Sequence, residues 1–414
     1  MTRLQEAHRE QKLNEKNDPL EFIFGDLLDT FAAGETVVLA ALAHFTEPAR
    51  LEWLLPLAAL SETAALTALD ALRDRALLIE DDAAGTWLLP PLAARFLRQR
   101  NPEAVGAAGE RLAEKAYALA VQHGYVDNAP FTELEIAWPT MRAALPLLVA
   151  GDNSRLQTVC NALADFLNFS GRWDDWLALS PDAETKALAS GDRRTAGWRA
   201  YQAGGIHLRR GDANAALACA ERCSAYWEQA QVDAGGRQAA ISLRGHGLQL
   251  RKDYATAISA FQQALDLARS LNPESVNVAV GLNDLAIARR LSGDLNGAET
   301  DYRESLRIAS KVGDAECIAI STGNLADFFL ERGDWPAVER QASEALELAH
   351  ALGRQELIAT NHLRLATAML RQQRAAQALP HAEEAAAIYT RLRYLDLAGA
   401  QATVAECKAA CAAS

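Results

Sequence analysis

A short polar turn recurs six times between residues 171 and 375 at a nearly constant interval. The first residues of these turns are 40, 41, 41, 40 and 40 positions apart: Gly171, Gly211, Lys252, Gly293, Gly333 and Gln373. A fixed period of this size is typical of an array of stacked units, because one unit alone cannot bury its apolar face. This repeat constrains the fold more than any other feature of the sequence.

Side chains of defined size flank each turn at matching positions. Seven residues before the turn residue stands Ala or Gly in every unit, and nine residues after it stands Phe, Tyr, Ala or Ser. Small residues let two antiparallel helices approach closely. Gly at the turn can adopt positive φ, and the Asp that usually follows can cap the next helix. The pattern predicts one helical hairpin per unit, and it resembles tetratricopeptide repeats, with six units over residues 155–394.

The region before the repeats has a different pattern. Two short apolar runs, residues 77–80 and 86–89, flank a polar loop that ends in Gly85, which predicts a β-hairpin. Apolar periodicity and capping residues before it predict helices over residues 19–31, 35–45, 51–60 and 62–75. Helices followed by such a hairpin predict a winged-helix domain. The expected organisation is a charged lead-in (1–18), a winged helix (19–100), a helical connector (101–154), the repeats and a capping helix (395–414).

The fold class is therefore predicted to be all-α: an α-solenoid preceded by a winged helix with one small hairpin. Net charge is −13, which argues against non-specific binding to nucleic acid or to anionic membranes. No apolar run approaches the roughly 18 residues that span a bilayer, and the polar start is unlike a signal peptide. We expect a cytoplasmic protein. Cys219 and Cys223 have helical spacing but lack complementary ligands, so neither a metal nor another cofactor is expected.

The order of these parts resembles the C-terminal half of STAND (NB-ARC-type) signalling ATPases. The residues that carry the resemblance are 18–45, the run 87–97 and the connector 134–145. The connector departs from the family's Glu-x-x-Asn-Leu, since Glu135, Trp138 and Pro139 stand there. The resemblance implies that a partner bound to the repeats rearranges an ATPase core and so switches an effector.

No Gly-x-x-x-x-Gly-Lys-Ser/Thr loop occurs in the sequence, so the chain is not expected to be an NTPase by itself. Either an ATPase or effector domain belongs to a longer form of the protein, or the chain is a relative that kept only the sensing half. No Gly-x-Ser-x-Gly or His-Glu-x-x-His motif is present, and the eight His residues are scattered along the sequence. The sequence predicts a protein without enzymatic activity.

Two other functions fit the same organisation. One is a transcriptional regulator whose winged helix binds DNA, and the other is a scaffold that holds two proteins. The helix over 62–75 would present Glu62, Asp70 and Asp74 outward, and Asp81 stands at the tip of the hairpin. Phosphates repel these carboxylates, which argues against DNA binding.

The concave face of such an array is lined by the first helix of each unit. Helix interiors disfavour Asn, so Asn283 and Asn324 need a reason, and an amide can pair with the backbone of an extended peptide. Gln202, Asp284 and Asn324 are expected to form a ladder along one channel, and arginines there can pair with ligand carboxylates. The alternative is a merely solvated face. The candidate residues for binding a protein or peptide are Tyr201, Gln202, Arg209, His246, Gln249, Asn283, Asp284, Arg290, Asn324, Asp327, Arg364 and Arg371.

Overall fold

The structure is a computed structural model that describes residues 30–81, 83–124 and 131–413. The chain divides into two compact units. One extends to His123 and includes residues 132–159, and the other contains the chain from Cys160 onward. The expected lead-in over residues 1–18 and the expected helix over residues 19–31 lie outside the described residues, except for 30 and 31.

The first unit begins with three helices and a small sheet. Its elements in chain order are α3 (Ala33–Leu42), β1 (Ala49–Arg50), α4 (Leu51–Ala58), α5 (Glu62–Asp74), β2 (Ile79–Asp81) and β3 (Thr86–Leu88). The sheet is antiparallel in the order β1-β3-β2, with Ala49 opposite Trp87 and Ile79 opposite Leu88. The expected hairpin is therefore present. The strand β1 adds a third strand that was not predicted, because two residues are too short to show any alternation in the sequence.

Local sequence explains where these helices begin. Ser61 precedes α5, and its hydroxyl accepts a hydrogen bond from the Ala64 amide at 3.4 Å. One face of α5 is apolar, and Leu69 and Leu72 are fully buried there. Three helices follow, α6 (Pro91–Arg100), α7 (Pro102–His123) and α8 (Thr132–Ala150), of which α7 and α8 lie in the expected connector. No single described helix is long and apolar enough to span a bilayer, although the bent pair α4 and α5 together meets that test of length and composition.

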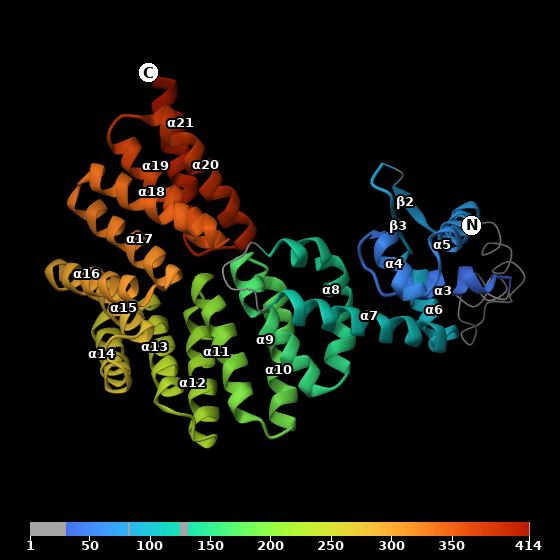
Figure 1. Cartoon of the computed structure of the whole chain (residues 1–414). Helices are drawn as coiled ribbons and strands as arrows, with labels where there is room; N and C mark the ends of the chain where they lie inside the picture. The colour runs from blue at the N-terminus through green and yellow to red at the C-terminus, as the bar shows by residue number, and fades with distance from the viewer. Residues whose placement is uncertain (1–29, 82, 125–130, 414) are drawn as a thin grey trace, which may run out of the picture. The chain divides into compact units, whose positions relative to one another are not determined.

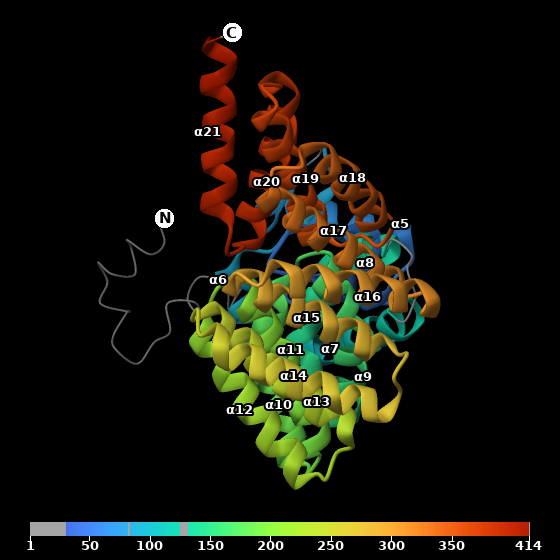
Figure 2. The ribbon, with the colours of Figure 1, turned by 90° about the vertical axis from the view of Figure 1, so that its left-hand side faces the viewer.

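The repeats form six successive antiparallel helix pairs, which Figure 1 shows from green to red. Each pair corresponds to one predicted unit. The pairs are α9 (Asn153–Phe169) with α10 (Trp173–Ala189), α11 (Arg193–Arg209) with α12 (Ala213–Gln229), α13 (Ala234–Leu250) with α14 (Tyr254–Leu271), α15 (Val276–Ser292) with α16 (Leu295–Val312), α17 (Ala315–Arg332) with α18 (Trp335–Ala351), and α19 (Gln355–Arg371) with α20 (Ala375–Leu392). A final helix, α21 (Leu397–Ala413), runs alongside α20 in Figure 2.

The predicted turn residues all adopt the left-handed conformation. Their φ angles lie between +62° and +94°, and Lys252 and Gln373 adopt φ of +62° although they are not glycine. Asp side chains cap four of the six helices that follow; Asp212, for example, accepts from the Ala215 amide at 3.0 Å. The same device recurs halfway through most units, as at Gly191 (φ +80°), which precedes Asp192. The chain therefore reverses direction about every 20 residues, in most cases at a left-handed residue.

Buried small and aromatic residues join each pair to the next. Tyr302 is fully buried and lies in one cluster with Ala286 of its own pair and with Leu325 and Phe328 of the following pair. A Cβ added at Gly245 would lie 2.7 Å from the ring of Phe261, so only glycine leaves room for that ring. This confirms the expected α-solenoid and explains why small residues recur in register.

The end of the array returns to its beginning. Residues 391–396, which we name the closing segment, contact the turns that follow α9 and α11. The Leu395 amide donates to the Arg209 carbonyl at 2.9 Å, and Arg391 Nη1 donates to the Ser170 carbonyl at 2.9 Å. A Cβ added at Gly171 would lie 2.1 Å from Leu392 Cδ2, so the closing segment lies in close contact with the turn at Gly171. The two ends of the array therefore meet, and we call this arrangement of the six pairs the ring.

Candidate functional site

A pocket of about 830 Å³ lies on the inner side of the ring. Its walls come mainly from α9, α11 and α13, with α15 and the closing segment completing them. Half of the candidate residues line this pocket: Tyr201, Gln202, Arg209, His246, Gln249 and Asp284. The first helices of the repeats thus face inward, as helical phase predicts.

One wall of the pocket is aromatic. The Trp198 ring meets Trp227 edge to face with ring centroids 5.0 Å apart, and Tyr201 lies 5.6 Å from Trp198. Gly197 makes this cluster possible, because a Cβ there would lie 2.2 Å from Trp227 Nε1. Trp198 nevertheless stays 39% exposed. An exposed Trp held by buried aromatic neighbours presents a rigid apolar surface for a ligand.

The floor of the pocket is polar and largely buried. Ser242 and Asp284 are only 6% and 5% exposed. The Ser242 hydroxyl and the Gln249 amide oxygen are buried without a hydrogen-bond partner among the described residues. Leaving such an atom unpaired costs about 1–3 kcal/mol. A ligand that donates hydrogen bonds here would therefore recover that cost.

His246 and Asp284 form a pair across two repeats, with His246 Nε2 3.2 Å from Asp284 Oδ2. Burial lowers the pKa of His246, but the Asp284 carboxylate outweighs it, so the pKa of His246 is raised above its usual value. The imidazole also packs against the Phe261 ring in a T-shaped arrangement, with ring centroids 4.8 Å apart, and this contact fixes its orientation. The pocket therefore contains an oriented His–Asp pair.

Arg209 connects the pocket to the far end of the array. Its Nη1 donates to the Gly205 carbonyl at 3.1 Å, and its Nε lies 3.4 Å from a Glu356 oxygen on α19. Burial raises the pKa of Glu356, but the charges of Arg354 and Arg209 outweigh this, and the pKa lies below its usual value. Arg354 in turn lies over the Phe169 ring at 4.6 Å. A set of charged side chains thus crosses the ring from α19 to α9 and α11.

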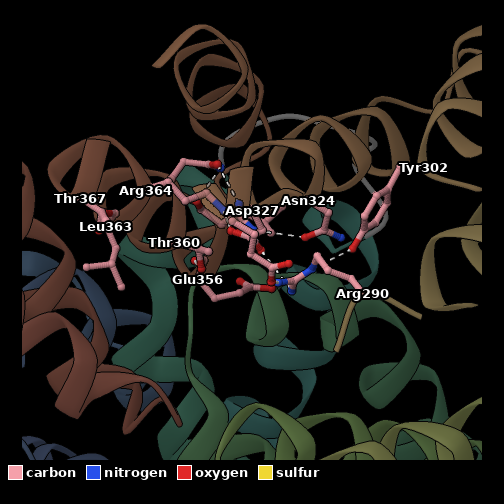
Figure 3. Close-up of polar contacts among 12 residues, drawn as sticks. Arg290, Tyr302, Asn324, Asp327, Glu356, Thr360, Leu363, Arg364 and Thr367 are labelled. Carbon is pink, nitrogen blue, oxygen red and sulfur yellow. Dashed lines mark hydrogen bonds and ion pairs between the residues drawn. The ribbon is translucent and has the colours of Figure 1, made fainter. Parts of the chain in front are cut away.

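The other candidate residues lie mostly in a second network on α15, α17 and α19, which Figure 3 shows. Arg364 donates to both carboxylate oxygens of Asp327, at 2.7 and 2.8 Å, and to the Asn324 carbonyl oxygen at 3.1 Å. Asn324 donates to Asn283 at 2.9 Å, and Arg290 lies 3.8 Å from Asp327. We name these five residues the inner network.

The inner network pairs its polar groups internally and so joins three repeats. The expected ladder does not form, because Gln202 accepts from Arg199 at 2.8 Å, Asp284 pairs with His246, and Asn324 pairs with Asn283. The amides at Asn283 and Asn324 therefore have a structural reason. A role of these residues in binding stays a prediction. Arg371 is exposed and makes no ion pair with any described residue.

Three histidines that the sequence did not bring together meet on the last repeats. His362 Nδ1 lies 2.7 Å from His381 Nδ1, and the His350 ring centroid is 6.2 Å from that of His362. Burial, with the charges of the other two histidines, lowers the pKa of His362 to about 4. The residues lie 12 and 19 positions apart, and helical pairing was the only signal for their proximity. Within the described ranges, no three His, Cys, Asp or Glu side chains are placed to hold a metal ion.

Comparison with known proteins identifies a family model that matches part of the repeat region. Residues 237–311, which contain α14 and α15 with parts of their neighbours, match the family model of the tetratricopeptide repeat. A search of curated proteins finds no match to the sequence.

One solved structure has a similar fold. A signal-transduction ATPase with numerous domains (STAND protein) with a tetratricopeptide repeat sensor, from Pyrococcus horikoshii, superposes with a TM-score of 0.54 at 15% identity over 94% of this chain. This chain spans 56% of that protein's length. A Rap protein complexed with competence and sporulation factor has a TM-score of 0.47 at 11% identity, and the two alignments cover 85% of this chain and 92% of that one. The chain therefore carries tetratricopeptide repeats within a helical fold shared with the STAND protein.

Proposed function

We propose that this chain is the sensor module of a STAND-type signalling protein, and that it binds a peptide or a protein segment in the pocket of the ring. The observation that carries the proposal is the pairing of an exposed Trp198 surface with a floor of buried, unpartnered polar atoms. Ligand sites in proteins combine such apolar walls with a few convergent polar groups. An extended peptide supplies both the apolar side chains and the backbone N–H donors that this pocket accepts.

The first unit supports a mechanical role in the same protein. Its order of helix, strand, two helices and hairpin supports our proposal of a winged-helix domain over residues 19–100, followed by a connector over 101–154 and repeats over 155–394. In a STAND-type protein this domain would link the sensor to an ATPase and effector region. Occupancy of the pocket would then alter that region.

The alternative of a DNA-binding regulator receives less support from the same unit. Arg73 is the basic residue in the last turn of α5, and its guanidinium is engaged by Asp70 at 3.0 Å and by Asp74 at 3.5 Å. Glu80 on the hairpin lies 3.5 Å from it as well. The carboxylates on this surface would repel the phosphates of DNA.

Selection of random peptides displayed on phage against the immobilised chain tests the proposal. Recovered peptides are expected to bind the wild-type chain, measured by fluorescence anisotropy, and to lose at least about tenfold in affinity on Trp198→Ala, since buried aromatic contacts dominate such interfaces. Leu271→Ala is the matched control, because Leu271 is a large apolar residue that is 56% exposed outside the pocket. Failure to enrich any peptide, or equal binding to the Trp198→Ala variant, would refute the proposal.

A further inference from the structure

The pocket and the closure of the ring share residues. Tyr394 and Leu395 of the closing segment form part of the pocket wall, opposite residues of α11 and α13. Arg209 takes part in both, since it lines the pocket and its carbonyl accepts the hydrogen bond from the Leu395 amide at 2.9 Å. A ligand in this pocket therefore touches both sides of the joint between the two ends of the array.

The outer contacts of that joint are weak by their nature. The ion pair between Arg393 and Asp174 is 3.0 Å long, but the side chains are 68% and 55% exposed. Exposed pairs of this kind add little stability. Leu395 is 48% exposed, so its apolar side chain has little cover in the closed ring. The outer edge of the joint thus relies on exposed contacts between residues that are far apart in the sequence.

Other contacts hold the joint in a defined geometry. The Tyr394 ring stacks on Tyr389 with centroids 4.5 Å apart and lies 6.2 Å from the Trp173 ring. Leu392 is fully buried against the turn at Gly171. The inner part of the closed arrangement is therefore specific in shape, whereas its outer contacts are exposed and weak.

We propose that the closing segment is a latch: the ring opens and closes at residues 391–396, and a ligand in the pocket holds it closed. The inference rests on the proposed function, because it assigns the regulation of the same pocket. Its direction follows from the geometry. The ligand meets Tyr394 and Leu395 together with α11 and α13 only in the closed ring, so it binds that state more tightly. Linkage then requires that closure raise the affinity for ligand by the same factor.

Two variants test the latch from opposite sides. Arg391→Ala with Arg393→Ala removes two tethers and no pocket residue. Gly211→Cys with Leu395→Cys, in a Cys411→Ser background, can be locked by oxidation, because a Cβ at Gly211 would lie 3.2 Å from Leu395 Cβ, close to disulfide geometry. Comparing the oxidised with the reduced form of the same protein cancels the effect of the substitutions themselves. Arg303→Ala with Arg307→Ala, which removes exposed ion pairs on α16, is the control.

The first readout is amide hydrogen exchange without ligand. The latch predicts that residues 391–396 exchange faster than the buried helices, and at least tenfold faster again in the Arg391→Ala, Arg393→Ala variant, with no change in the control. Exchange as slow as that of the buried helices in both proteins would overturn the proposal.

The second readout uses a peptide from the selection described above as the probe. It is expected to dissociate at least tenfold more slowly from the oxidised than from the reduced Gly211→Cys, Leu395→Cys protein, and to bind at least tenfold more weakly to the double-alanine variant. Equal binding in all these forms would overturn the latch and leave the peptide-binding function intact. If no peptide is selected, the proposed function fails, and the exchange experiment still decides whether the ring opens.

Discussion

Arg364 is the centre of the inner network, and its replacement by methionine is the sharpest test of how the repeats are joined. Its side chain is 7% exposed, and the carboxylate it holds, Asp327, is 26% exposed. Methionine keeps most of the apolar stem, so Arg364→Met removes chiefly the charge and the donors. The variant loses the bidentate pair with Asp327 and leaves the carbonyl oxygens of Asn324 and Asn361 without their donor.

The magnitude follows from burial. Breaking a fully buried ion pair costs about 3–5 kcal/mol because one charge is left uncompensated. Since Asp327 keeps some contact with solvent and Arg290 lies 3.8 Å away, we expect a loss of about 2–4 kcal/mol in the free energy of unfolding. That loss corresponds to a fall in Tm of about 5–15 °C for a unit of this size. The exposed Arg303, paired with Glu299 at 2.8 Å, gives the control, and Arg303→Ala is expected to cost less than about 1 kcal/mol.

The stability loss of the Arg364→Met variant should also depend on pH. Burial raises the pKa of Asp327, but Arg364 and Arg290 outweigh it, so the pKa lies below its usual value. This group therefore contributes stability above its unfolded pKa of about 3.9, and that contribution is lost as pH falls through the lower folded value. In the Arg364→Met variant the Asp327 carboxylate is more easily protonated. The difference in free energy of unfolding between wild type and variant should therefore shrink as pH falls from 7 to 4. Urea denaturation followed by circular dichroism at both pH values measures it. A loss below about 1 kcal/mol at pH 7, or a deficit independent of pH, would refute the reasoning.

Three further predictions concern single positions. Lys252→Gly relieves a left-handed φ of +62° and should raise the free energy of unfolding by about 0.5–1 kcal/mol in urea denaturation; a loss would contradict it. Gly197→Ala places a methyl 2.2 Å from Trp227 Nε1 and should cost about 1–3 kcal/mol with a change in tryptophan fluorescence, whereas Gly106→Ala, with nothing within 4 Å, should gain up to about 1 kcal/mol. His246 should titrate above about 6.5 by NMR, since Asp284 outweighs the effect of burial on its pKa, and Asp284→Asn should lower that midpoint; an unchanged midpoint would contradict the pairing.

The repeat pattern predicted the solenoid because each of its signals is local. A turn residue such as Gly293 and the Asp294 that follows it lie beside the groups they affect, so their spacing gives both helix ends directly. The similar turn at Gly191 was not predicted, because the 40-residue repeat predicts only its own turn residues and not the turns that lie midway between them. The strand β1 left no trace because two residues cannot show alternation.

The candidate site was predictable in part, for a different reason. Helical phase placed residues such as Tyr201 and His246 on the inner face, and the pocket contains them. Phase does not give the twist between repeats, however, and this twist decides that Asn324 pairs with Asn283 rather than facing the channel. The contact between Arg391 and Ser170 joins residues 221 positions apart, and no local pattern encodes it.

The joined ends of the array change how its parts should melt. In an open stack of repeats the terminal units have one neighbour each and unravel first, so stability is close to a sum over adjacent pairs. Here the last pair also borders the first, through Leu392 at Gly171 and Arg354 over Phe169. Neither terminal pair can fray without giving up contacts with the opposite end, so loss of α20 should loosen α9 and α10 although the chain separates them by some 200 residues.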